Sequence, residues 1–229
     1  MSGKLPEDLS VLDDGARLQT FDGGLLDRTP DPELERLVAR AAEVSGFPIA
    51  LVSLVVDQIQ FFRAHVGLPP DLRASLATDR CTSFCQFVVA GDRPLHIEDA
   101  RQVAELPTDL VERYGIRAYV GFPLRVQGKT VGSLCVIDVK PGTLAPERLE
   151  ELSRLAEAAR TRLEVLASKW APPANAAEEK SHRAWMAVAE SQSLASLGEQ
   201  FAEGRLTFEE FQRGLGALAS LAGRLEQKP

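Results

Sequence analysis

The alternation of apolar and polar residues predicts a helix followed by a hairpin in the first third of the chain. Within residues 29–46 apolar positions recur at helical spacing, and Gly46 follows the last of them, where a helix would end. Residues 47–66 are instead rich in β-branched and aromatic side chains and contain one short polar turn, which predicts two antiparallel strands. Residues 68–80 contain paired prolines, and we expect a loop there.

Shorter elements are predicted in the middle of the chain. Residues 81–89 are apolar, contain Ser83 near their start and are followed by Ala-Gly-Asp, which indicates a helix of about two turns. A short strand is expected within residues 93–100. A small helix is expected within residues 106–117, and it should end at Gly115.

A second hairpin and a long helix are predicted next. Residues 118–126 and 130–139 are rich in strand-forming residues and are separated by a Gln-Gly-Lys turn. Residues 145–171 carry a stripe of leucine and alanine, which predicts a long exposed helix. Strands that are neighbours in the sequence are joined by tight turns, so the sheet should be mainly antiparallel with helices packed against it. The expected class is therefore α+β.

The composition of the chain changes near residue 170. A stretch rich in proline and alanine follows, which indicates a linker, and two further helical patterns come after it. We therefore predict an N-terminal extension at 1–19, a folded domain at 20–170, a linker at 171–178 and a C-terminal helical hairpin at 179–229.

Composition and charge exclude several classes of protein. The chain has 229 residues and a formal net charge of −7, and its 26 Lys and Arg residues form no basic run, so no nucleic-acid partner is expected. No apolar stretch approaches the roughly 20 residues that span a bilayer, and the N-terminus lacks a secretory signal, so we expect a cytoplasmic protein without membrane contact. The three cysteines are too few for a disulfide framework, and a reducing compartment would keep them as thiols.

Two of these cysteines, Cys81 and Cys85, lie four residues apart. On one helix face their Cα atoms would be about 6 Å apart, near the upper edge of disulfide geometry, so an oxidisable pair is one hypothesis. The alternative is structural, because free cysteine packs as a small apolar residue, and Cys135 alternates with its neighbours as a strand core residue does. The three cysteines and His96 do not have the spacing of a zinc site, and neither a metal nor another cofactor is expected.

Three blocks of sequence resemble, in residues and in order, the GAF domain common at the N-terminal side of bacterial histidine kinases and diguanylate cyclases. The blocks are FPIALVSLVVDQIQFFRAHVGL, SFCQFVVAGDRPLHIEDA and GIRAYVGFPLRVQGKTVGSLCVIDVKPGTLAPERLEEL. The resemblance spans roughly residues 20–168. It implies a six-stranded antiparallel sheet with long N- and C-terminal helices on one face and a small-ligand pocket on the other. Such domains sense small molecules or serve as dimerisation and relay modules, and no kinase, cyclase or phosphodiesterase signature follows here.

The resemblance also limits the ligands to be expected. Cyclic-nucleotide-binding members use an asparagine in a constellation that this chain does not match, because its only asparagine is Asn175. Bilin-binding members attach the chromophore through a cysteine just before the segment equivalent to 110–121, and none is present there. Haem would require an axial ligand such as His65 or His96. Free methionine sulfoxide reductases of the family use three cysteines with another spacing, so no catalytic residue is assigned and the chain is not expected to be an enzyme.

The pocket implied by the resemblance should be lined by aromatic residues and cysteines, with an arginine as a polar anchor. Aromatic side chains at such positions also fill the layer between a sheet and its helices, so a pocket filled by side chains is the alternative. The predicted lining residues are Phe62, Arg63, Phe84, Cys85, Phe87, Tyr119, Phe122 and Cys135.

The apolar stripes of the two long helices favour a homodimer formed through a helical bundle. The predicted interface residues are Leu34, Leu37, Val38, Leu152, Leu155, Ala159 and Leu163. The expected function is a non-enzymatic signalling module that binds an unknown small ligand or a partner signalling protein, the latter through the C-terminal helices. Two alternatives stay open: a structural dimerisation scaffold with a filled pocket, and a thiol-based redox sensor that uses Cys81 and Cys85.

Overall fold

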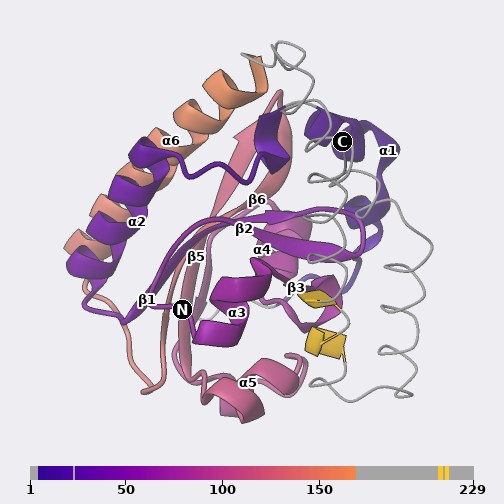
Figure 1. Ribbon diagram of the computed structural model, residues 1–229. Helices are drawn as coiled ribbons and strands as arrows, with labels where there is room; N and C mark the ends of the chain where they lie inside the picture. Colours follow the sequence, from indigo (N-terminus) through magenta and orange to yellow (C-terminus); the bar gives the residue numbers. More distant parts are fainter. Residues whose placement is uncertain (1–4, 23, 169–210, 214, 217–229) are drawn as a thin grey trace.

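The computed structural model describes residues 5–22, 24–168, 211–213 and 215–216 (Figure 1). The predicted linker at 171–178 and most of the predicted hairpin at 179–229 lie outside the described residues. Within these limits the chain forms one six-stranded antiparallel sheet with helices on both faces, so the predicted α+β class and strand number are confirmed.

The sheet has the strand order β3-β2-β1-β6-β5-β4, and every neighbouring pair is antiparallel. The strands are β1 (Ile49–Val55), β2 (Ile59–Val66), β3 (Ala77–Asp79), β4 (Leu95–Ile97), β5 (Ala118–Val126) and β6 (Lys129–Asp138). Both predicted hairpins are present, as β1–β2 and β5–β6. The β5–β6 turn is tight because Gln127 and Gly128 both have positive φ, 50° and 74°, and the twist of such a turn matches that of the strands.

Two long helices, α2 (Pro32–Ser45) and α6 (Pro146–Ser168), lie side by side on one face of the sheet (Figure 1). Asp31 caps the start of α2, and Gly46 ends the helix with a φ of 74°, so the predicted end is confirmed. Arg162 of α6 forms an ion pair with the same Asp31 carboxylate. The two helices are therefore joined by a polar contact as well as by their apolar faces.

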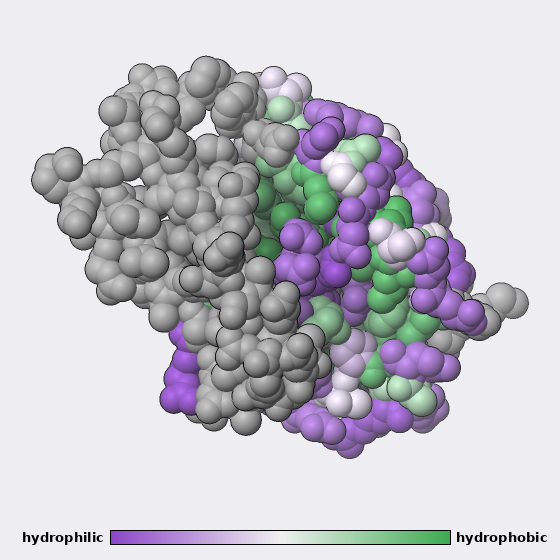
Figure 2. Space-filling model, turned by 90° about the vertical axis from the view of Figure 1, so that its right-hand side faces the viewer, coloured by the Kyte–Doolittle hydropathy of each residue, from purple (hydrophilic) through white to green (hydrophobic). Residues whose placement is uncertain are grey.

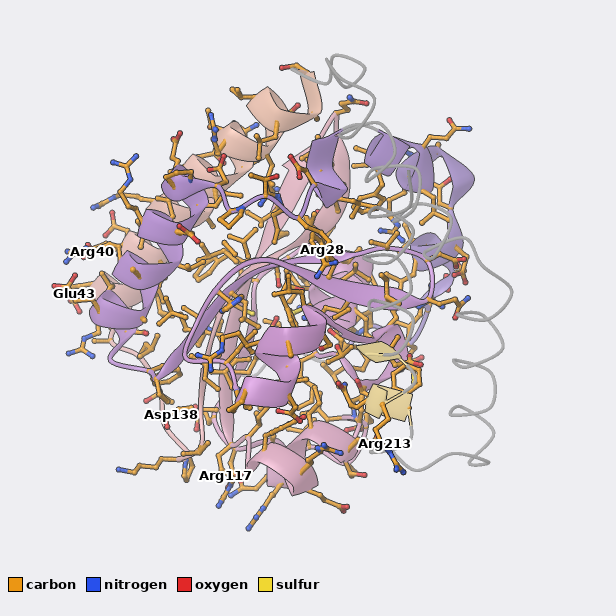
Figure 3. The ribbon with its side chains drawn as sticks, viewed as in Figure 1. Arg28, Arg40, Glu43, Arg117, Asp138 and Arg213 are labelled. Carbon is orange, nitrogen blue, oxygen red and sulfur yellow. The ribbon has the colours of Figure 1, made fainter. Side chains whose placement is uncertain are left out.

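The apolar stripes of α2 and α6 face the sheet, and this corrects the predicted dimer interface. Leu34, Val38, Leu152, Ala159 and Leu163 are fully buried in the core beneath the helices, and Leu37 and Leu155 are partly buried against it. Side chains inside the core of one chain are not available to a second one. The outward faces carry charged pairs instead, such as Arg40 with Glu43 and Glu151 (Arg40 and Glu43 are labelled in Figure 3). Dimerisation itself stays a prediction.

Short helices cover the opposite face of the sheet, and one of them corrects the predicted loop at 68–80. That segment contains α3 and β3. Pro70 stands in the first turn of α3, where the missing N–H of proline costs no hydrogen bond, and Leu72 is a buried residue of the same helix. The α-helices here are α3 (Pro70–Ser75), α4 (Cys85–Gly91) and α5 (Asp109–Tyr114). The remaining short elements are the α-helix α1 (Gly15–Leu18) and the 3-10 helices Ser10–Asp13, Gln19–Asp22, Gly24–Leu26, Arg80–Thr82 and Ala100–Gln102.

The helix predicted over residues 81–89 is divided in two. Arg80–Thr82 form a 3-10 turn and α4 begins only at Cys85, because Ser83 has extended backbone angles (φ −87°, ψ 134°). The Ser83 hydroxyl accepts a hydrogen bond from the backbone N–H of Cys85 at 3.0 Å. Cys81 and Cys85 therefore do not share a helix face, and the geometric basis of their predicted pairing is wrong.

The N-terminal residues pack against the sheet. Leu12 is buried in the core on the short-helix face, and Arg17 is only 1% exposed. The Arg17 guanidinium donates hydrogen bonds to the carbonyl of Leu12 and to those of Val55 and Val56 at 2.5 and 3.4 Å. These contacts hold the start of the chain to the end of β1.

The described residues near the C-terminus pack at the same place. Phe211 and Leu215 are buried against Ile59 and Val56, which lie at the β1–β2 turn. Both described ends of the chain thus contact one hairpin turn.

The described surface is largely polar. On the face shown in Figure 2, hydrophobic residues gather in patches between broad hydrophilic areas. Among the described residues, the exposed large apolar side chains are Val11 and Val139. Among the helices that the structure describes, none has the length and apolar character needed to cross a bilayer.

Candidate functional site

A cavity of about 40 Å³ lies between the sheet and the short helices that cover it. By volume it holds about three to four water molecules, whereas a cavity of roughly 150 Å³ takes up benzene. Every described side chain on its wall is uncharged. The lining residues are Ile49, Leu51, Gln60, Phe62, Leu68, Pro69, Leu72, Thr78, Phe84, Cys85, Leu110, Tyr114, Ile116, Tyr119 and Ile137.

The predicted pocket residues divide between this cavity and other places. Phe62, Phe84, Cys85 and Tyr119 line the cavity wall. Phe87 and Cys135 are buried in the same core but are not part of the wall.

Phe122 and Arg63 were assigned to the wrong side of the sheet. Phe122 belongs to the core beneath α2 and α6, because it lies three residues from Tyr119 and side chains along a strand alternate between faces. Arg63 follows Phe62 directly and donates from Nη1 to the carbonyl of Thr29 at 3.0 Å, away from the cavity. The alternation of side chains along a strand by itself places Phe122 on the opposite face from Tyr119, and Arg63 on the opposite face from Phe62.

Several residues of the cavity wall are not among those predicted from the sequence. Gln60 had a detectable signal, since it is a polar residue within an apolar strand and is only 3% exposed. Leu72 lies in the segment that was expected to be a loop. Leu110 and Tyr114 belong to the small helix α5, whose position over the cavity depends on contacts far apart in the sequence.

Buried polar side chains form a network at one wall of the cavity. Gln60 Nε2 donates to Ser53 Oγ at 2.6 Å and to Cys85 Sγ at 3.2 Å, and Thr78 Oγ1 donates to Gln60 Oε1 at 3.2 Å. Tyr119 OH donates to the same Cys85 sulfur at 3.4 Å. Because an unpaired buried polar group costs about 1–3 kcal/mol, this network favours the position that Cys85 has in the reduced protein.

Cys85 has a second thiol as its neighbour. Its Sγ lies 3.8 Å from Sγ of Cys135 on β6, and both side chains are fully buried. Gly121 leaves the space that the Tyr119 ring occupies beside this pair, because a Cβ at position 121 would overlap that ring. Strand β6 and the first residue of α4 thus bring together two cysteines fifty positions apart in the sequence.

The two thiols have different acidities. Burial raises the pKa of Cys85, but hydrogen bonds from Cys135, Ser133, Tyr119 and Ser53 outweigh burial and lower it below the ordinary value of a thiol. The hydrogen bond to Cys85, together with burial, raises the pKa of Cys135 well above that value. Cys85 is therefore the thiol of the pair that gives up a proton more readily.

Cys81, the other half of the predicted redox pair, is exposed. Its backbone N–H donates to Asp79 Oδ1 at 2.7 Å. Protein atoms packed around the sulfur, together with the Asp79 carboxylate, raise the pKa of the Cys81 thiol to about 12. The thiol is thus exposed but is held in its less reactive protonated form.

A polar contact joins two of the elements that cover the cavity. Tyr114 OH of α5 donates to Asp71 Oδ2 of α3 at 2.6 Å, and Arg113 Nη2 lies 3.1 Å from the same oxygen. Burial and the Asp71 contact raise the pKa of Tyr114 above its ordinary value, so this hydroxyl stays a donor. We call this contact the α3–α5 clasp.

The candidate haem ligands are not at the cavity. Neither His65 nor His96 belongs to its wall, and His96 instead packs edge-on against Phe122 with ring centroids 6.0 Å apart. In the part of the chain that the structure describes, no group of three or more His, Cys, Asp and Glu side chains is arranged to hold a metal ion.

Comparison with solved structures finds partial similarity to several proteins. A type II free methionine-R-sulfoxide reductase from Thermoplasma acidophilum has a TM-score of 0.49 and 14% identity, over 58% of this chain and 90% of that one. The GAF domain of an Acinetobacter phosphoenolpyruvate-protein phosphotransferase has a TM-score of 0.46 and 15% identity, over 59% and 79% of the two chains.

Sequence comparison assigns the family. A cyclic di-GMP phosphodiesterase from Pseudomonas aeruginosa is 35% identical over 149 residues, which are 63% of this chain and 24% of the relative. The chain thus spans about a quarter of that protein. The family model described as GAF domain matches residues 29–163, more than half of the chain. The protein described here therefore belongs to the GAF domain family.

Proposed function

We propose that this GAF domain is a sensory module that binds a small uncharged molecule in the cavity and relays the bound state to the C-terminal part of the chain. The observation that carries the proposal is the cavity wall. It is apolar on most sides, is uncharged among the described residues, and carries amide, hydroxyl and thiol groups gathered at one place. A few polar groups in an otherwise apolar pocket are what orients a small ligand.

The volume of the cavity sets the size of the ligand and the strength of binding. A space of about 40 Å³ suits a molecule of about four non-hydrogen atoms or fewer. Small ligands gain at most about 1.5 kcal/mol per non-hydrogen atom, so the binding free energy is limited to about 6 kcal/mol. The dissociation constant is then tens of micromolar or weaker.

Strand β2 offers a route for the relay. Gln60 lines the cavity, and its neighbour Ile59 packs against Phe211 and Leu215. A ligand that competes for the Gln60 amide changes β2 next to the place where the C-terminal residues contact it. Such a relay requires two states of the domain that differ in their affinity for the ligand.

The uncharged wall favours binding over hydrolysis of a phosphodiester. Burying phosphate charges without a compensating cation is costly, and no cationic side chain among the described residues lines the cavity. Most of the P. aeruginosa relative lies outside the matched region. We therefore propose that the present domain regulates a reaction carried out elsewhere.

The proposal is tested by titrating methyl-labelled protein with 1-propanol and, in parallel, with propionate. Propanol should shift the methyl signals of Leu51 and Ile137 saturably and leave those of Leu124 and Leu134, on the other face, unchanged. Propionate should bind at least about tenfold more weakly, because its charge would be buried. Equal binding of both compounds, or no saturable binding, contradicts the proposal. The second outcome is the one that a scaffold with a filled pocket predicts.

A cavity-filling variant localises the site. Leu72→Phe adds volume to the wall and should abolish the propanol response. Leu155→Phe makes the same substitution at a partly buried position on α6 and should preserve the response. If both variants bind propanol like the parent protein, the cavity is not the site.

A further inference from the structure

Cys85 has two roles in the structure that no other described residue combines. Its side chain forms part of the cavity wall, and its sulfur lies 3.8 Å from that of Cys135. A disulfide bond requires an S–S distance of about 2.05 Å, so the two sulfurs need to approach by less than about 2 Å. Cys85 is the first residue of α4, and a helix end adjusts more easily than the middle of a sheet.

The surroundings of Cys85 suit a peroxide as well as a thiol. Gln60 Nε2 and Tyr119 OH both donate toward its sulfur, at 3.2 and 3.4 Å, so two hydrogen-bond donors converge on the atom that a peroxide oxygen would approach. A hydroperoxide is uncharged at neutral pH. Hydrogen peroxide and the smallest alkyl hydroperoxides contain two to about four non-hydrogen atoms, which is the size that the cavity volume allows.

We propose that Cys85 and Cys135 form an oxidisable thiol pair and that the cavity admits a small hydroperoxide to Cys85. The inference rests on the proposed function, because the peroxide is the uncharged ligand and the cavity is its route to a fully buried sulfur. It also replaces the sequence hypothesis that paired Cys85 with Cys81.

The reaction balances in two steps. In the first, the Cys85 thiolate attacks the terminal oxygen of ROOH and the O–O bond breaks. Cys85 becomes a sulfenic acid, and the leaving alkoxide, or hydroxide when the peroxide is H₂O₂, takes up a proton equivalent to the one that Cys85 released on ionisation, which gives ROH. In the second, the Cys135 sulfur attacks the Cys85 sulfur, the S–OH bond breaks, and the leaving hydroxide takes up the Cys135 thiol proton to form water. The peroxide is reduced by two electrons, and the two thiols are oxidised to one disulfide.

Oxidation also changes the hydrogen bonds on β2. A disulfide sulfur is a poorer acceptor than a thiolate, so the Gln60 amide and the Tyr119 hydroxyl lose a partner in a buried place. Gln60 adjoins Ile59, where the C-terminal residues pack. Oxidation of the two thiols would therefore affect the C-terminal residues through strand β2, as ligand binding would.

The test is oxidation of the full chain by limiting hydrogen peroxide, followed by unfolding, alkylation and mass spectrometry of each cysteine. Cys85 and Cys135 should be lost together, as one disulfide-linked peptide, at least about tenfold faster than the exposed Cys81, since the thiolate is the nucleophile. Loss of Cys81 first, with the other two still thiols, overturns the inference. A disulfide between Cys81 and Cys85 overturns it as well.

Single variants assign the order of events. In Cys135→Ser, dimedone should trap a sulfenic acid at Cys85, because the second thiol is missing. In Cys85→Ser, Cys135 should stay a thiol under the same treatment. Oxidation of Cys135 at the parent rate in the second variant contradicts the proposed order.

The propanol titration separates this inference from the proposed function. It is repeated on the double variant Cys85→Ser, Cys135→Ser. If propanol binds but the parent protein forms no disulfide, the thiol inference fails and the binding function stands. If propanol does not bind and no disulfide forms, both fail.

Discussion

Asp31 and Arg162 join the beginning of α2 to the end of α6 through a two-pronged ion pair. Arg162 Nε lies 3.1 Å from Asp31 Oδ1, and Arg162 Nη2 lies 2.6 Å from Oδ2. The same carboxylate accepts the backbone N–H groups of Glu33 and Leu34 at 3.2 and 3.0 Å. Burial raises the pKa of Asp31, but these hydrogen bonds lower it more, and the net pKa is below the ordinary value.

Removal of this carboxylate should weaken both helices at once. Asp31→Ala loses a helix cap and a half-buried ion pair, and we expect the free energy of unfolding to fall by about 2–3 kcal/mol in a urea titration. The control is Glu150→Ala, which breaks an exposed pair with Arg154 and should cost less than about 0.5 kcal/mol. Equal losses in the two variants would show that the Asp31 contact carries no special stability.

The ion pair between Asp99 and Arg117 should make the stability of the fold sensitive to acid. Arg117 Nε and Nη2 donate to the two Asp99 oxygens at 2.7 and 2.6 Å, which lowers the pKa of Asp99 to about 2 (Arg117 is labelled in Figure 3). The folded pKa lies below the unfolded one, so this contribution is present above about pH 4 and is lost as the pH falls toward 2. Asp99→Asn should reduce the slope of stability against pH in that window.

The slope is measured by urea unfolding at several pH values between 4 and 2. Glu105→Gln, at an exposed position, is the matched control and should keep the parent slope. An unchanged slope in Asp99→Asn would count against the role of the Arg117 contact.

The stability of the fold should be sensitive to any replacement of Arg17. Burial lowers the pKa of this guanidinium to about 10, yet it stays charged at neutral pH and donates to the carbonyls of Val55 and Val56. Arg17→Met leaves buried carbonyls without donors, and we expect a loss of about 2–4 kcal/mol. The change appears as a melting temperature lower by roughly 4–16 °C for a chain of this length. Arg101→Met, at an exposed position, should change it little; similar shifts in both would contradict the assignment.

The α3–α5 clasp should control entry to the cavity. Tyr114→Phe removes the hydroxyl that binds Asp71 but keeps the ring on the cavity wall. We expect propanol to exchange at least about threefold faster, measured by line broadening of the Leu51 methyl signals, because a net hydrogen bond contributes about 1 kcal/mol. Leu155→Phe again serves as the control. Unchanged exchange in Tyr114→Phe means that the ligand enters elsewhere.

The thiols should differ in how their reaction with peroxide depends on pH. The pKa of Cys85 is lowered, so its rate should already be near its maximum at neutral pH and should fall on acidification. The pKa of Cys81 is about 12, so its rate should keep rising through the alkaline range. Alkylation and mass spectrometry at each pH give both rates from one sample. Parallel profiles for the two cysteines would contradict the assigned acidities.

Elements with a strong local pattern could be predicted from the sequence. The helix ending at Gly46 and the two hairpins follow from apolar spacing and turn residues, and each is present. The division of residues 81–89 could not be predicted in the same way, because it depends on the extended backbone of Ser83. Apolar stripes on α2 and α6 cannot by themselves distinguish a core from an interface between chains, since both bury the same side chains.

The cavity wall was only partly predictable for a related reason. Alternation along β5 separates Tyr119 from Phe122, and this local rule was available from the sequence. The contact between Cys85 and Cys135 was not, because it depends on where α4 crosses the sheet over β6. Non-local placement of this kind leaves no periodic trace in the sequence.

The β1–β2 turn, where Arg17 and Phe211 both attach, has a mechanical consequence. A force applied between the two described ends of the chain can pass through this turn alone. It would run from the Arg17 guanidinium through Val56 and Ile59 to the Phe211 ring, and it would not stretch β5 or β6. The contacts of Arg17 and those of Phe211 then both depend on the position of the β1–β2 turn. A displacement of this turn would therefore reach both attachments at once.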